Sequence, residues 1–65
     1  MSVRTLLEDF LEFNYFKAYS WEELQKRVRI FFNEKGYTLE RYMLDNVVVD
    51  WSENEENHTV AIYIE

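Results

Sequence analysis

The sequence predicts an α+β domain in which two N-terminal helices pack on one face of a three-stranded antiparallel sheet, in the order α-α-β-β-β. Three observations lead to this fold class. Apolar residues recur with a helical period over the first 35 residues, and they alternate with polar residues over 46–64. In addition, 65 residues suffice for a single domain with a thin core, which we take to span 1–65.

The first helix is expected near residues 3–15. Thr5 and Glu8 have the spacing of a capping box, and Ser2 is an alternative start. The periodicity fails near Asn14, where Phe16 would fall on the outer, acidic face. The predicted buried arc consists of Val3, Leu6, Leu7, Phe10 and Phe13.

The second helix is expected near residues 20–35. Ser20 and Glu23 form a capping-box pair, and Gly36, the only glycine, stands where a left-handed residue commonly ends a helix. Ile30 would project from the outer face of this helix. The predicted buried stripe consists of Trp21, Leu24, Val28, Phe31 and Phe32.

Two strands are expected over residues 46–52 and 58–64, joined by a seven-residue polar loop, Ser52–His58. The segment 37–44 is expected to form the third strand, with a short helix capped by Thr38 as the alternative. The face predicted to lie against the helices carries Val47, Val49, Trp51, Val60, Ile62 and Ile64.

The sequence offers little for catalysis, and we expect that the protein is not an enzyme and uses no cofactor. It has no cysteine and a single histidine, His58, beside a polar loop, and one glycine cannot build a phosphate-binding loop. The run from Asp50 resembles the start of a calcium loop, but Glu55 and Ala61 occupy the positions that require Gly and Glu. No metal site is therefore predicted.

The chain is expected to be soluble and cytoplasmic. Glu8 and Asp9 interrupt the region where a signal peptide would need a continuous apolar stretch. No run approaches the roughly 20 apolar residues of a membrane span.

The net charge of −6 comes entirely from the last 24 residues. Residues 1–41 carry seven acids and all seven bases, whereas residues 42–65 carry six acids and no base. This field repels phosphates, so direct nucleic-acid binding is not expected. The acids serve either solubility and edge protection or docking on a basic protein surface. They are Asp45, Asp50, Glu53, Glu55, Glu56 and Glu65.

A surplus of apolar residues, 48 % of the chain, predicts a contact surface as well. Strand alternation places Tyr42, Leu44, Val48, Ala61 and Tyr63 on an open sheet face beside Asp50. We therefore expect a homodimer or an obligate partner, with this face as the contact.

The leading hypothesis is a small acidic binding protein or inhibitor that docks on a basic surface, such as one that normally holds nucleic acid. Clustered carboxylates can imitate the phosphate spacing of DNA, as in small viral or mobile-element inhibitors, which is an analogy of composition only. The alternative is a self-associating structural or regulatory subunit. The predicted partner-binding residues are Asp50, Glu53, Glu55, Glu56, Tyr42, Val48, Tyr63 and Asp45.

Overall fold

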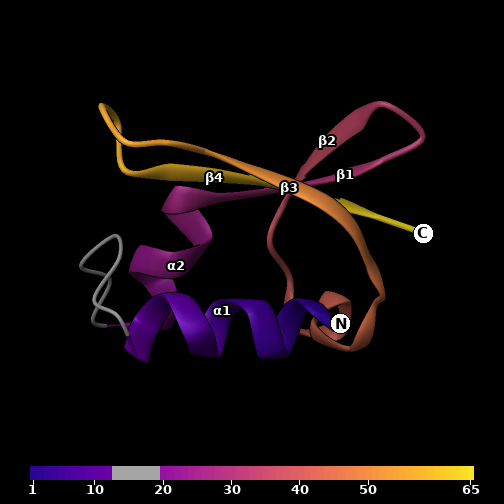
Figure 1. Cartoon of the computed structure of the whole chain (residues 1–65), viewed down its shortest axis with the longest axis horizontal. Helices are drawn as coiled ribbons and strands as arrows, with labels where there is room; N and C mark the ends of the chain where they lie inside the picture. Colours follow the sequence, from indigo (N-terminus) through magenta and orange to yellow (C-terminus); the bar gives the residue numbers. More distant parts are fainter. Residues whose placement is uncertain (13–19) are drawn as a thin grey trace.

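The computed structural model describes the backbone of residues 1–12 and 20–65, and the side chains of 1–10 and 20–65. Its elements are α1 (Val3–Glu12), α2 (Trp21–Arg27), β1 (Val28–Phe32), β2 (Lys35–Thr38), the 3-10 helix η1 (Arg41–Asp45), β3 (Val48–Asn54) and β4 (Thr59–Ile64). Both α-helices lie on the same side of the sheet (Figure 1).

The sheet has four strands in the order β2-β1-β4-β3, and its central pair, β1 and β4, is parallel. The outer pairs, β1 with β2 and β3 with β4, are antiparallel. The prediction of a three-stranded antiparallel sheet is therefore wrong, although the α+β class holds. The error arose because the segment that forms β1 was interpreted as the second half of a helix.

Helix α1 begins at Val3, and Ser2, the alternative start, caps it. The Thr5 backbone N–H donates to Ser2 Oγ at 3.2 Å, and the Leu6 N–H donates to the Ser2 carbonyl at 3.1 Å. Four of the five residues of the predicted arc are confirmed as buried: Val3, Leu6, Leu7 and Phe10. The fifth, Phe13, and the outer-face residue Phe16 lie outside the described residues.

Helix α2 has the predicted cap, because Ser20 Oγ accepts from the Glu23 N–H at 3.2 Å. It nevertheless ends at Arg27, and the chain runs straight into β1 from Val28, whose φ of −115° and ψ of 132° are extended. The β-branched and aromatic run Val28–Phe32 favours a strand, and pairing with β4 stabilises it there. The predicted helix over 20–35 is therefore wrong beyond Arg27.

This change alters the exposure of side chains along the segment. Ile30, predicted to project outward, is 0 % exposed, and Phe32, predicted to be buried, is 42 % exposed. Phe31 is half-buried and opposes Gly36 across the β1–β2 pair. A period of two has replaced a period of 3.6, which leaves Val28 buried but changes the exposure of the residues after it.

Gly36 does not end a helix and does not have a positive φ. The reversal is made by Asn33 and Glu34, whose φ angles of 51° and 66° suit the two-residue hairpin turn with two left-handed residues. A Cβ on Gly36 would lie 3.1 Å from Cε1 of the Phe31 ring, so the glycine leaves room for that ring.

The segment 37–44 follows neither of its two predicted forms as a whole. It is strand as far as Thr38, and η1 then forms over Arg41–Asp45 without a side-chain cap from Glu40. Between the two elements, Leu39 is fully buried and its carbonyl accepts from Gln25 Nε2 at 3.2 Å. Burial of Leu39 and Met43 fixes this connection against the core.

The β3–β4 hairpin is confirmed, but β3 begins and ends two residues later than expected, and the loop comprises only residues 55–58. A bulge between Val48 and Asp50 shifts the register. As a result Val49 is 65 % exposed and Val47 is also exposed, although both were predicted to face the helices. Val48, predicted to be open, is half-buried against the core.

One core unites the elements on the helix side of the sheet. Val28, Ile30, Val60 and Ile62 of the two central strands meet the buried residues of α1, together with Leu24, Leu39 and Met43. In the described part of the chain, no helix is long and apolar enough to cross a membrane.

Candidate protein-binding surfaces

The eight residues predicted to bind a partner do not form one surface. Three regions must be distinguished, and each is built by different elements. The acidic hairpin carries Glu53, Glu55 and Glu56. The outer row crosses the sheet face opposite the helices and comprises Gly36, Phe31, Tyr63 and Asp50. The aromatic pocket, described below, contains Tyr42.

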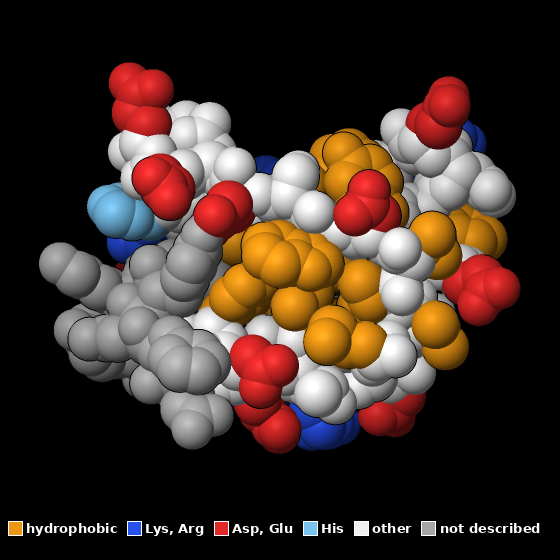
Figure 2. Space-filling view, in the orientation of Figure 1, with side chains coloured by type: hydrophobic (Ala, Val, Ile, Leu, Met, Phe, Trp, Pro, Cys, Tyr) orange, Lys and Arg blue, Asp and Glu red, His pale blue; other side chains and the backbone are white. Residues whose placement is uncertain are grey.

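The acidic hairpin is shaped by its own backbone. Asn54 Oδ1 accepts from the Asn57 N–H at 3.1 Å, and His58 has a φ of 53°, which turns the chain into β4. Arg27 Nη1 donates to the His58 carbonyl at 3.3 Å and ties the hairpin to α2. The carboxylates of Glu53, Glu55 and Glu56 are left exposed, and acidic side chains stand out at this end of the molecule (Figure 2).

The hairpin carboxylates have no cationic partner among the described residues. Within residues 1–10 and 20–65 the ion pairs are Arg4 with Asp45 and Arg27 with Glu23, both at 3.6 Å. Local desolvation, and then the neighbouring Glu55 carboxylate, raise the pKa of Glu53 above its ordinary value. Glu53 is thus an acid whose charge is disfavoured in the isolated chain.

The outer row confirms part of the predicted open face. Tyr63 and Asp50 are register partners there, and the Tyr63 ring stacks on Phe31 with centroids 5.1 Å apart. The Asp50 carboxylate accepts from the Trp51 N–H at 2.8 Å, so it already satisfies a local donor. The face is more polar than expected, because Arg29 also lies on it and donates to Thr38 Oγ1 at 2.7 Å.

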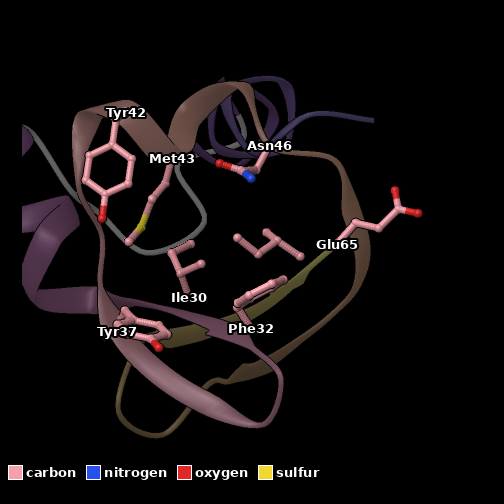
Figure 3. A pocket seen from close by; sticks show the side chains of 8 residues that line it. Ile30, Phe32, Tyr37, Tyr42, Met43, Asn46 and Glu65 are labelled. Atoms are coloured by element: carbon pink, nitrogen blue, oxygen red, sulfur yellow. The ribbon is translucent and has the colours of Figure 1, made fainter.

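The aromatic pocket lies between the helix side of the sheet and η1 and has a volume of about 360 Å³. Figure 3 shows Phe32 and Tyr37 on one side and Tyr42 and Met43 on the other, with Ile30 between them, whereas the Glu65 carboxylate points away. The full lining is Ile30, Phe32, Tyr37, Tyr42, Met43, Asn46, Ile64 and Glu65.

Three of the predicted residues are therefore placed differently from the expectation. Tyr42 lies on η1 and not on the sheet, and its side chain is 77 % exposed. Val48 packs against the core. Asp45, at the end of η1, pairs with Arg4 near the start of α1, away from the hairpin acids. For Tyr42 and Asp45 the physical reason is that residues 41–45 are wound as a helix, so strand alternation does not apply to them. For Val48 the reason is the bulge in β3.

Sequence reasoning missed Phe31, Phe32 and Tyr37 as surface aromatics. The signal that could have found them is the run Val28–Phe32, in which every residue except Arg29 is β-branched or aromatic. Asn33, which tolerates a positive φ, directly follows that run and could have marked a turn. The helical interpretation was preferred because Trp21, Leu24 and Val28 also fit a helical period.

An exposed apolar strip follows β3, which is an edge strand of the sheet. Its members are Met1, Val47, Val49 and Trp51, and Figure 2 shows apolar side chains exposed on this side of the molecule. The strip is anchored at both ends. Val48 N–H donates to the Met1 carbonyl at 2.8 Å, and the Trp51 ring packs edge-on against Phe10 with centroids 5.0 Å apart.

Among the described residues, no group of three or more histidine or acidic side chains could hold a metal ion. Comparison with known proteins adds no assignment: no family model, curated protein or solved structure matches the chain. What the surfaces themselves define is a set of exposed carboxylates, an apolar strip and an aromatic pocket.

Proposed function

We propose that this protein is a small binding module that docks its acidic hairpin on a basic surface of a partner protein. The observation that carries the proposal is the set of exposed carboxylates on Glu53, Glu55 and Glu56, which have no cationic partner among the described residues. Charges of one sign gathered on a projecting hairpin raise the rate of encounter with a basic surface and reject acidic ones.

The raised pKa of Glu53 gives the proposed docking a pH dependence. A basic side chain of a partner would favour the charged carboxylate and lower that pKa on binding. Binding would then release protons from Glu53 at pH values near its pKa, and affinity would rise with pH through that range. A basic surface that normally holds nucleic acid is one target that fits this chemistry, because it is built to neutralise closely spaced anions.

The test compares two variants with the same net charge. The hairpin variant carries Glu53→Lys, Glu55→Lys and Glu56→Lys, and the control carries Glu8→Lys, Asp9→Lys and Glu40→Lys at exposed sites elsewhere. Each replaces three acids with three bases and changes the net charge from −6 to 0. Each variant and the parent are used to capture partners from the native host lysate, with identification by mass spectrometry.

We expect the parent and the control to retain a common basic protein at low salt and to lose it at high salt, because screening weakens exposed charge pairs. The hairpin variant is expected to lose it at both, with little change in melting temperature, since exposed charges contribute little to stability. Binding by the hairpin variant within about twofold of the parent would overturn the proposal. Equal loss by both variants would reduce the effect to net charge and would also overturn it.

A second candidate function is self-association, which the exposed strip of Met1, Val47, Val49 and Trp51 favours. An unpaired edge strand with apolar side chains can pair with a second copy of itself. In such a pair the acids of β3, Asp50 and Glu53, would be brought close to their counterparts. The two candidate functions therefore respond to salt in opposite directions.

A further inference from the structure

Three aromatic side chains that line the aromatic pocket remain exposed to solvent. Phe32 and Tyr37 are each 42 % exposed and Tyr42 is 77 % exposed, and they come from three elements, β1, β2 and η1. Their backbones are held by buried neighbours, because Ile30 and Met43 belong to the core. The rings therefore surround a small pocket on a fixed support, which is the arrangement of a ligand site.

The charge around the pocket favours a cation. No lysine or arginine lines it, and its one carboxylic acid, Glu65, points its carboxylate away from the rings (Figure 3), so the aromatic faces themselves supply the attraction. The faces of aromatic rings carry negative potential and attract cations within about 6 Å. The chain as a whole adds a net charge of −6.

The nearby bases of the described chain are placed elsewhere. Arg41 precedes Tyr42, but its guanidinium lies over the Trp21 ring, 4.6 Å from the centroid. Arg29 is bonded to Thr38. Lys35 is the register partner of Phe32, but it does not line the pocket. The pocket is thus free of the chain's own described cations.

We propose that the aromatic pocket binds the guanidinium group of an arginine side chain supplied by the basic partner. This deepens the proposed function and rests on it for the source of the arginine. A planar guanidinium stacks on aromatic rings and is more weakly hydrated than an ammonium, so it is the better occupant of a pocket lined by rings. Arg41 over Trp21 shows the same contact within this chain.

The geometry also suggests how the partner is oriented. The β3–β4 turn, which carries the hairpin acids, and the β1–β2 turn lie at opposite ends of the sheet (Figure 1), in a molecule whose longest extent is 28 Å. Phe32 and Tyr37, which flank the β1–β2 turn, line the pocket. An interface of ordinary size, about 800 Å² per partner, covers a comparable width. The hairpin supplies attraction to a basic surface, and the pocket supplies a fixed point that selects one side chain on it.

The test uses defined small probes and the whole chain at low salt. N-acetyl-arginine amide is titrated into the isotope-labelled protein and followed by NMR, with N-acetyl-citrulline amide as the neutral probe of the same shape. We expect saturable shifts at Phe32, Tyr37, Tyr42 and Met43 with arginine, and ring-current shifts of the arginine side-chain protons. Citrulline should bind more weakly by about two- to fivefold, the range of an exposed cation–π contact.

Matched variants locate the site. Tyr42→Ala should weaken arginine binding by about two- to fivefold, whereas Tyr42→Phe should retain it, because the ring and not the hydroxyl makes the contact. Tyr63→Ala, which removes a partly exposed tyrosine of the outer row, is the control and should leave binding unchanged. Tyr37→Ala provides a second test from another element, so the outcome does not depend on the folding of one variant. Spectra of each free variant verify that the fold is retained.

Equal binding of citrulline and arginine would overturn the proposal, since the pocket would then not recognise a cation. Shifts spread over the hairpin acids and absent from the pocket would also overturn it. The hairpin variant separates this inference from the proposed function. If that variant still binds arginine at the pocket but captures no partner, the result supports both the arginine site and the proposed function. If it captures the partner normally while the pocket binds arginine, the proposed function fails and the pocket remains.

Discussion

At the scale of single residues, backbone conformation decides which side chains are displayed. Asn33 and Glu34 both adopt a positive φ, which allows a two-residue turn between β1 and β2. Asparagine tolerates this conformation, whereas glutamate adopts it against the repulsion between its Cβ and the backbone. The turn therefore holds its shape because the strands around it are paired.

This strain predicts that Glu34→Gly stabilises the protein. Relief of the left-handed conformation should exceed the greater entropy loss of glycine, for a net gain of about 0.5–1 kcal/mol in the free energy of unfolding. Chemical denaturation measures the change. Glu34→Ala is the matched control, because alanine keeps the strain, and a gain of the same size in that variant would contradict the explanation.

The raised pKa of Glu53 predicts a pH dependence of folding stability. Because desolvation and Glu55 raise its pKa above 4.5, the folded chain holds this proton at pH values where the unfolded chain has lost it. The group therefore favours the folded state at low pH, and that contribution is lost as the pH rises through the folded-state pKa. Carboxyl NMR titration should find this raised pKa, and Glu55→Gln should lower it only in part, since desolvation is the larger cause. A full return to the ordinary value would assign the shift to Glu55 instead.

At the scale of elements, the transition from α2 to β1 is the feature that organises the molecule. Val28 closes the helix through its N–H, which donates to the Leu24 carbonyl, and also opens the strand. The alternation that follows sends Ile30 into the core and Phe31 onto the outer row. The same residues would have the opposite exposure on a continuous helix, so two substitutions distinguish the two forms.

Ile30→Ala should destabilise the protein by about 2–4 kcal/mol, because it removes a fully buried side chain between the sheet and the helices. Phe31→Ala should cost less, about 1–2 kcal/mol, since the ring is half-buried, stacks on Tyr63 and lies beside Gly36 on the outer face of the sheet. Thermal or chemical unfolding of both variants gives the comparison. A larger loss for Phe31→Ala than for Ile30→Ala would favour the helix over the strand.

At the scale of the whole molecule, uncompensated acids and exposed apolar side chains coexist on the β3 side. Val49 and Trp51 alternate along this strand with Asp50. Like charges on two copies would oppose pairing of two β3 edges, as charged edge strands do in other proteins. The same charges would attract a basic partner, so ionic strength decides which association is favoured.

We therefore expect the isolated protein to be monomeric at about 0.02 M salt and to dimerise increasingly toward about 0.5 M, as the charges are screened. Sedimentation equilibrium at high micromolar concentration measures this. Val49→Lys should suppress the dimer at high salt, because it places a charge in the apolar strip. A dimer that is strongest at low salt would contradict this, and so would one that Val49→Lys leaves intact.

The sequence by itself determined the elements whose signals are local. The cap at Ser20, the buried arc of α1 and the period-2 alternation of β4 were all predicted, because caps and periodicity depend on neighbours a few residues apart. The acidic character of the hairpin was likewise a property of composition, and the structure places those acids at the exposed end of the β3–β4 hairpin.

Only the tertiary structure decided the conformation of Val28–Phe32, since this run fits a helix by period and a strand by residue type. Parallel pairing with β4, some 30 residues away along the chain, stabilises the strand, and no local pattern reveals such a partner. The bulge at Val48 and Asp50 and the winding of residues 41–45 were decided in the same way, by which side chains the core could bury. The aromatic pocket follows from these non-local choices, because it needs β1, β2 and η1 together.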